Sequence, residues 1–159
     1  MSMGKLLAGF IVIAAIIMGA GLYYTQVYAY YERVSSEAPI AQMRMVSIAT
    51  GEPEAILAQD VQAIESDSSP IRFRACFRTT MSKALLTETY VLADDAVPLT
   101  APGWFDCFDA YEIGTAIESG EALAFLAERD IHDGVDRLIA VFADGRAFAW
   151  HQLNEKYKD

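Results

Sequence analysis

The sequence predicts an α+β protein, in which an N-terminal transmembrane helix precedes one small domain with an antiparallel sheet and two or three helices. Three observations lead to this prediction. First, residues 6–24 carry no charge, which is typical of a transmembrane helix. Second, the apolar runs 137–142 and 146–153 flank an Asp-Gly pair, which favours a tight hairpin whose two central residues have positive φ. Third, residues 109–120 begin with Asp and end with Gly, which are both helix-capping signals.

The first segment, LLAGFIVIAAIIMGAGLYY, is long enough to cross the hydrocarbon core of a membrane, which is roughly 30 Å thick. Five of the eight tyrosines lie just after or at its end, and tyrosine rings prefer the headgroup level, so we expect Tyr23, Tyr24 and Tyr28 to lie at the interface. The helix should continue past residue 24, because no Gly or Pro follows before Pro39. We therefore assign residues 1–34 to the anchor and 35–159 to the domain.

A cleaved signal peptide is the alternative, since the residues VYA at 27–29 meet the small-residue rule for cleavage. The apolar run is longer than the usual core of such a peptide, which favours an uncleaved anchor. Ala8, Ala15 and Gly19 share one helical face, where small residues would let another helix approach closely.

The orientation of the anchor rests on weaker signals. Lys5 precedes the apolar segment and Arg33 follows it at a similar distance, so the positive-inside rule barely decides. A short N-terminal tail before a large domain is typical of an anchor whose N-terminus stays in the cytoplasm. We therefore expect a single-pass protein of the bacterial inner membrane with its domain in the periplasm.

Within the domain we expect a sheet of four or five strands, covered on one face by two helices. The segments that support this are a strand at 43–49, an ambiguous helix or strand at 53–67, a strand at 71–78, a helix at 81–92 capped by a Thr-Thr pair, and a strand or helix at 121–131.

The net charge of −10 argues against nucleic-acid binding, which needs a basic surface. It suits a domain that avoids anionic headgroups or that meets a basic partner. Three of the twelve basic residues nevertheless fall within the strand predicted at 71–78. Strand alternation places two sets on opposite faces: Ile71, Phe73, Ala75 and Phe77 on one, and Arg72, Arg74, Cys76 and Arg78 on the other. The three arginines could dock an anion or an acidic partner.

The two cysteines, Cys76 and Cys107, most simply form a disulfide in an oxidising compartment. The bridge would then bring Asp106 and Asp109 close to Arg74 and Arg78, so that ion pairs form around it. The alternative is a Cys76 thiolate whose pKa is lowered by the arginines, although no CxxC motif is present.

No other arrangement points to catalysis or to a cofactor. The spacing of the cysteines and of His132 and His151 matches no compact metal site, so we expect no metal. Phosphate loops, nucleophile elbows and HExxH motifs do not occur in the sequence. Trp104 and Phe105 lie in a loop after Pro-Gly, either buried under the domain or exposed as an interface anchor.

The stretches SSPIRFRACF, LTETYV, DDAVPL, APGWFDCFDA and DGRAFAWHQ together resemble an uncharacterised alphaproteobacterial family of small, singly anchored membrane proteins. The resemblance covers nearly the whole chain as far as His151. It implies that members share both cysteines and the arginines, here Arg72, Arg74, Cys76 and Cys107, and that some carry a longer C-terminal tail. It also implies a Gram-negative inner membrane, but it brings no established activity.

These observations predict a non-enzymatic accessory subunit, or an assembly or stability factor, of an integral membrane protein complex. Its surroundings would include membrane lipid. A respiratory complex of the cytochrome bc1 or cytochrome c oxidase type is the specific expectation, because an acidic domain suits a basic cytochrome c. The alternatives are a thiol-dependent periplasmic redox protein that uses Cys76 and a stand-alone periplasmic module that binds anions.

Overall fold

The computed structural model describes residues 2–158, which divide into two compact units between Tyr31 and Glu32. The first unit is one helix, α1 (Met3–Tyr24), which continues as a π-helical turn over Thr25–Ala29. The 22 residues of α1 span about 33 Å, and none of them is buried. The whole helix, Met3–Ala29, is the one helix of the described residues that is long and apolar enough to cross a membrane.

The two compact units meet between Tyr31 and Glu32, three residues before the boundary that the sequence suggested. The helix ends at Ala29, and the first strand, β1 (Glu32–Val34), already pairs with β4 (Gln59–Glu65) in the domain. A three-residue strand has no periodicity by which the sequence could distinguish it from the end of a helix.

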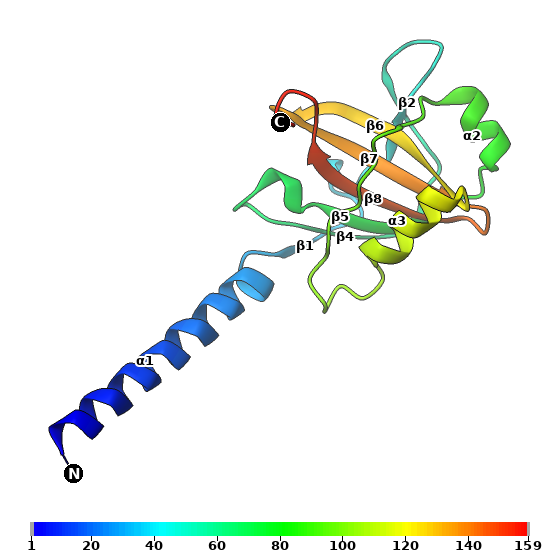
Figure 1. Cartoon of the computed structure of the whole chain (residues 1–159). Coiled ribbons are helices and arrows are strands. Elements are labelled where there is room, and N and C mark those ends of the chain that lie inside the picture. The colour runs from blue at the N-terminus through cyan, green and yellow to red at the C-terminus, as the bar shows by residue number, and fades with distance from the viewer. Residues whose placement is uncertain (1, 159) are drawn as a thin grey trace. The chain divides into compact units, whose positions relative to one another are not determined.

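The second unit is built on an antiparallel sheet, which confirms the α+β class (Figure 1), although the sheet has six strands and not the four or five that were expected. Its spatial order is β1, β4, β5 (Arg74–Arg78), β8 (Arg146–Leu153), β7 (Val135–Phe142) and β6 (Ala122–His132). A separate ribbon pairs β2 (Arg44–Val46) with β3 (Pro53–Ala55). The two helices of the domain are α2 (Lys83–Thr89) and α3 (Ala110–Ser119).

Each face of the sheet is covered by different residues. Along β8, Ala147 and Ala149 belong to the larger apolar core, while Phe148 and Trp150 alternate with them on the opposite face. The larger core holds residues of the sheet, of β2 and of α2: Met43, Met45, Ala63, Phe73, Ala75, Phe77, Leu86, Tyr90, Phe125, Ala127, Ile139, Val141, Ala147 and Ala149. On the opposite face Phe108 packs edge-on against Phe148 and Trp150.

The prediction that both helices cover one face is wrong. Leu86 places α2 in the larger core, whereas α3 follows directly from the loop that holds Phe108. The segment next to α3 is also fixed to the Phe148 face, because Val97 donates a backbone hydrogen bond to Gln152, which in turn accepts one from Trp150. Apolar residues on both faces of β8 require cover on both sides, so one helix lies on each.

Two segments that the sequence left ambiguous are strands. Residues 53–67 contain β3 and β4, and residues 122–131 lie within β6. The strand expected at 71–78 begins only at Arg74, because Pro70 opens a 3-10 turn over Pro70–Arg72.

The helix predicted at 81–92 is the shorter α2, and its N-cap is Ser82, whose side chain accepts from the Leu85 N–H. The Thr-Thr cap was therefore wrong, although α3 has the predicted caps, Asp109 and Gly120.

The hairpin between β7 and β8 is confirmed, but its turn differs from the expectation. Among the described turn residues only Gly145 has a positive φ, of 87°. The Gly145 N–H donates to the Phe142 carbonyl oxygen, which is the geometry of a three-residue loop closed by a left-handed glycine. A Cβ atom at this position would lie 2.7 Å from the Thr79 carbonyl oxygen, so the turn also needs glycine for its close approach to the end of β5.

Candidate functional site

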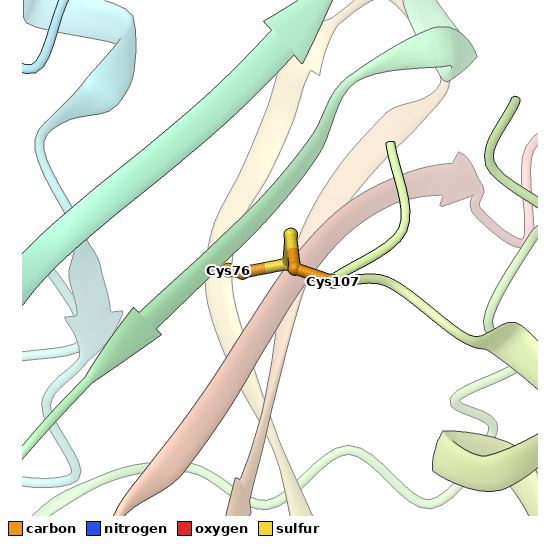
Figure 2. Close-up of a disulfide and its surroundings, with 2 residues drawn as sticks. All are labelled: Cys76 and Cys107. Carbon is orange, nitrogen blue, oxygen red and sulfur yellow. A yellow bond between two sulfur atoms is a disulfide. The ribbon is translucent and has the colours of Figure 1, made fainter. Parts of the chain in front are cut away.

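A disulfide joins β5 to the loop before α3, as predicted (Figure 2). Cys76 and Cys107 are 31 residues apart in sequence, and their Cα atoms are 6.3 Å apart. Neither of the two is a free thiol in the structure. Cys76 is only 7% exposed, because it faces Phe148, its partner in the neighbouring strand.

One edge of the disulfide lines a surface pocket of about 240 Å³. Arg78 and Arg146 also line it, and they are opposite each other on β5 and β8, two positions along from Cys76 and Phe148. Asp60 lines the opposite side from an irregular stretch of β4 and has a positive φ of 53°. Arg146 is already engaged, because it forms ion pairs of 2.8 Å with Glu112 and with Asp144.

Arg74 is a buried structural residue, with 3% of its surface exposed. Its Nε donates to the Leu99 carbonyl oxygen at 2.8 Å, and its Nη1 donates to those of Ile71 and Phe73 at 2.7 and 2.6 Å. Further bonds to Thr100 fasten the chain that crosses this face of the sheet. The Arg74 guanidinium thus joins β5 to residues 99 and 100, and the disulfide joins the same strand, two residues further on, to Cys107.

The three arginines do not form one exposed row. Arg72 precedes the strand, in the 3-10 turn, and its Nη1 donates to the Ser68 hydroxyl. Arg78 is exposed, and its Nη2 donates to the Asp144 carbonyl oxygen at 3.0 Å. Whether Arg72 and Arg78 dock an anion or a partner stays a prediction, but Arg74 is enclosed.

Asp106 and Asp109, the acidic residues expected to form ion pairs beside the bridge, are placed differently. The Asp109 carboxylate caps α3 by accepting from the backbone N–H groups of Tyr111 and Glu112. Asp106 is exposed. The Arg74 guanidinium, which we expected to pair with these carboxylates, donates instead to carbonyl oxygens.

The two loop aromatics divide between burial and partial exposure. Phe105 is buried, with 2% of its surface exposed. Trp104 is half-buried, and the Arg33 guanidinium lies over its ring at 5.3 Å from the centroid. The loop therefore covers the sheet with one ring and contacts β1 with the other.

The residues of the predicted packing face and interface lie on the anchor helix. Ala8, Ala15 and Gly19 are exposed, and a Cβ atom added to Gly19 would meet no atom within 4 Å. At the other end of the helix the ring of Tyr28 stacks on that of Tyr24, with centroids 5.8 Å apart. The Tyr23 ring meets Tyr28 edge-on.

A buried Arg137–His151 pair is the polar feature that the sequence did not predict. The two residues are directly opposite on β7 and β8, and Arg137 Nε donates to His151 Nε2 at 3.0 Å. His151 Nδ1 therefore carries the proton and donates to the Pro70 carbonyl oxygen at 2.7 Å. Burial, and then the charge of Arg137, lower the pKa of His151 to about 3, so the imidazole is neutral. The Asp-Gly turn locates the hairpin, but a two-residue turn centred on it would set Arg137 opposite Gln152, and only the observed three-residue loop sets it opposite His151.

Residues 43–159 match the model of a family described as a family of unknown function, DUF6446. The chain belongs to this family. The match confirms the predicted membership of a domain family of unknown function. It covers the domain from the start of β2 onward and includes the disulfide, Arg74 and the Arg137–His151 pair. Searches among curated proteins and among solved structures gave no match.

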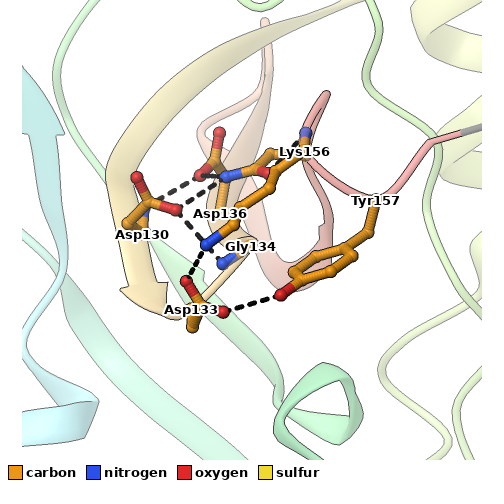
Figure 3. A network of polar contacts seen from close by, with 7 residues as sticks. Asp130, Asp133, Gly134, Asp136, Lys156 and Tyr157 are labelled. Atoms are coloured by element: carbon orange, nitrogen blue, oxygen red, sulfur yellow. Dashed lines mark hydrogen bonds and ion pairs between the residues drawn. The ribbon is translucent and has the colours of Figure 1, made fainter.

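The DUF6446 domain also has an acidic cluster at the turn between β6 and β7 (Figure 3). The Asp130 and Asp136 carboxylates accept hydrogen bonds from Asn154, and Asp133 binds Lys156 and Tyr157. The two donors to Asp133 lower the pKa of its carboxyl below the usual range. These contacts fasten the C-terminal turn to the hairpin. Across residues 2–158, no three His, Cys, Asp or Glu side chains are grouped so that they could hold a metal ion.

Proposed function

We propose that the chain is a non-catalytic accessory subunit, or an assembly or stability factor, of a bacterial inner-membrane protein complex. The observation that carries this proposal is the apolar helix Met3–Ala29. None of its most apolar stretch is buried within the structure. Its surface includes the small residues Ala8, Ala15 and Gly19 on one face. A membrane-spanning helix with such a face is suited to pack against other helices.

The disulfide supports a domain outside the cytoplasm. Disulfides persist in oxidising compartments such as the periplasm and are rare where thiols are kept reduced. Cys76 and Cys107 fix the loop of residues 102–109 to the central part of the sheet. The position of the bridge in the structural core fits a domain that matures in the periplasm.

Within this class we propose a respiratory complex of the cytochrome bc1 or cytochrome c oxidase type. The support is the net charge of −10, which would favour the approach of a basic soluble cytochrome. The charge would then act on association rate, so its effect should weaken as salt increases.

The test is recovery of the full-length chain from native membranes. The chain is given a C-terminal tag and extracted in mild detergent, and the co-purifying proteins are identified by mass spectrometry and by haem absorbance. Stoichiometric recovery of a multisubunit complex supports the accessory role, and haem absorbance assigns it to the respiratory class. Recovery of a lone chain, or of a processed chain that lacks the helix, contradicts the proposal.

A matched pair of anchor variants sharpens the experiment. Ala15→Leu combined with Gly19→Leu fills the small-residue face and should abolish co-purification. Ala14→Leu combined with Ala20→Leu adds nearly the same volume on other faces of the helix and should leave co-purification intact. Equal retention by both variants would contradict helix packing through the predicted face.

A second candidate is a thiol–disulfide exchange protein, because the Cys76–Cys107 bridge lines an open pocket together with Arg78 and Arg146. In the exchange, a partner dithiol would be oxidised to a disulfide while this bridge takes up its two electrons and two protons. Nearby guanidinium groups favour a thiolate and so would make the bridge easier to reduce. A structural bridge should instead resist mild dithiothreitol in the folded protein, as followed by thiol alkylation and mass shift.

A further inference from the structure

A second pocket, of about 310 Å³, lies between the start of the domain and the far end of β6 and β7. It is lined by residues from three parts of the fold that are distant in sequence. They include Ile40 and Gln42, Arg44 on β2, Glu128 and His132 on β6, and Arg137 on β7. This pocket is separate from the disulfide and from the residues on which the proposed accessory role depends.

Arg137 is the buried charge in this pocket, with 2% of its surface exposed. Its Nε donates to His151 and its Nη1 donates to the Ile40 carbonyl oxygen at 2.9 Å. The plane of the guanidinium lies over Phe73, 4.2 Å from the ring centroid. Its Nη2 is the one buried side-chain nitrogen or oxygen within residues 2–158 that has no hydrogen-bond partner. An unsatisfied buried donor on a charged group is costly, so it marks a position for an acceptor.

The positive charge of Arg137 also lacks a direct counter-ion. No carboxylate within the described residues forms an ion pair with it, and its imidazole partner His151 is neutral. Burial lowers the pKa of Arg137 to about 10, which still leaves it charged at neutral pH. Glu128, which is opposite Arg137 on β6, and Glu65 stabilise the charge without forming an ion pair, and Arg44 opposes it. A buried charge without a partner is destabilising, and a bound anion would offset that cost.

We propose that this pocket binds a small oxyanion of the phosphate class. Arg137 would supply the unpartnered Nη2 donor, and Arg44 and His132 would supply donors from the rim. A tetrahedral oxyanion accepts hydrogen bonds from several directions, which suits donors carried on three different strands. Gln42, Arg44 and His132 are exposed, so their side chains can rotate to admit the anion.

Glu128 is the carboxylate that lines the pocket, and its negative charge allows a test in which a substitution should strengthen anion binding. Its charge repels an anion, so the wild-type affinity should be lower than the arginines alone would give. Removal of this charge should strengthen binding, whereas removal of the Arg44 charge should weaken it. A surface that attracts anions only through its overall charge would not distinguish between neighbouring residues in this way.

The probe is inorganic phosphate, added at constant ionic strength to the full-length chain in a phosphate-free maltoside detergent. Isothermal titration should give saturable binding of one phosphate per chain, and the melting temperature should rise with phosphate concentration. Short-chain phosphatidylglycerol, added as a competitor, separates two sources of the group. Displacement of phosphate assigns the site to a lipid headgroup, and failure of the lipid to compete assigns it to a free phosphate.

Four variants decide the proposal. Arg44→Gln should weaken phosphate binding about tenfold, since it removes one charge-assisted hydrogen bond. Glu128→Gln should tighten binding, and Arg129→Gln, which removes an exposed charge outside the pocket, should leave it unchanged. Arg137→Lys keeps the charge without Nη2 and should also weaken binding. Absence of saturable binding by the wild type, or an equal effect of Arg44→Gln and Arg129→Gln, would overturn the proposal. The anchor and its co-purifying proteins are not involved in this measurement, so its failure would leave the accessory role untouched.

Discussion

Arg137 and His151 are directly opposite on neighbouring strands, and the charged residue donates its Nε–H to the neutral imidazole across 3.0 Å. The arrangement fixes the tautomer, because His151 can accept at Nε2 only while its proton is on Nδ1. Protonation of the ring would set two buried cations against each other. The pair therefore makes the domain sensitive to acid.

We expect the free energy of unfolding to fall as the pH drops below 6.5. The pKa of His151 is about 3 in the folded chain and near 6.5 when unfolded, so acid protonates the unfolded state first. The stabilisation is complete above pH 6.5 and is lost progressively toward pH 3, with about 2 kcal/mol lost by pH 5. Denaturant unfolding of the full-length chain between pH 7.5 and 5 measures this loss.

Two variants identify the residue responsible for this dependence. His151→Gln can still accept from Arg137 and donate to Pro70, but it cannot take up a proton, so the slope between pH 6.5 and 5 should flatten. His132→Gln removes an exposed imidazole and should preserve the slope. An unchanged slope in His151→Gln would contradict the assignment.

Arg74→Ala should destabilise the domain by about 3 kcal/mol or more. The substitution leaves several buried carbonyl oxygens without their donor, among them those of Leu99 and Phe73. Arg72→Ala is the matched control, because this side chain is half-exposed and its change should cost less than about 1 kcal/mol. Thermal unfolding of both variants makes the comparison. Similar costs at the two positions would show that Arg74 is not a structural donor.

Gly145→Ala should cost more than about 2 kcal/mol, because it adds a contact with Thr79 to the strain of a positive φ. Gly51→Ala isolates the two effects. Gly51 has a similar φ of 73°, but a Cβ atom there would meet nothing within 4 Å, so we expect a cost of about 1 kcal/mol. If denaturant unfolding shows the same loss of stability in the two variants, the close approach to Thr79 does not contribute to the free energy of unfolding.

Replacement of Cys76 and Cys107 together by alanine should lower the free energy of unfolding by about 3 to 4 kcal/mol, given the 31-residue separation. The mechanism is greater freedom of the unfolded chain. Wild type unfolded in the presence of reductant should show the same loss. A double variant as stable as the oxidised wild type would leave the bridge without a structural role and would strengthen the redox alternative.

Local signals predicted the parts of this fold that depend on neighbours in sequence. The Asp-Gly turn located the hairpin, Asp109 and Gly120 bounded α3, and an uncharged run located the anchor helix. Alternation correctly placed Phe73, Ala75 and Phe77 in one core. These features rest on capping, turn geometry and periodicity, which act over a few residues.

Features that depend on distant partners could not be predicted in the same way. The sequence predicts an exposed Arg74, because the carbonyl oxygens of residues 99 and 100 that accept its hydrogen bonds are distant in sequence. β1 is a strand only because β4 lies next to it, and α2 and α3 cover opposite faces because β8 is apolar on both. The candidate oxyanion pocket combines three segments, so no single stretch of sequence carries its signal.

The disulfide that fixes residues 102–109 to β5 would also report on biogenesis under the proposed single-pass topology. Its two sulfurs can join only where an oxidant is available, so their chemical state would depend on the side of the membrane on which the domain folded. A chain whose domain stayed in the cytoplasm would retain two thiols that react with an alkylating label, while a chain inserted as proposed would not. The bond would thus be a built-in record of topology, readable as a mass difference without any added reporter.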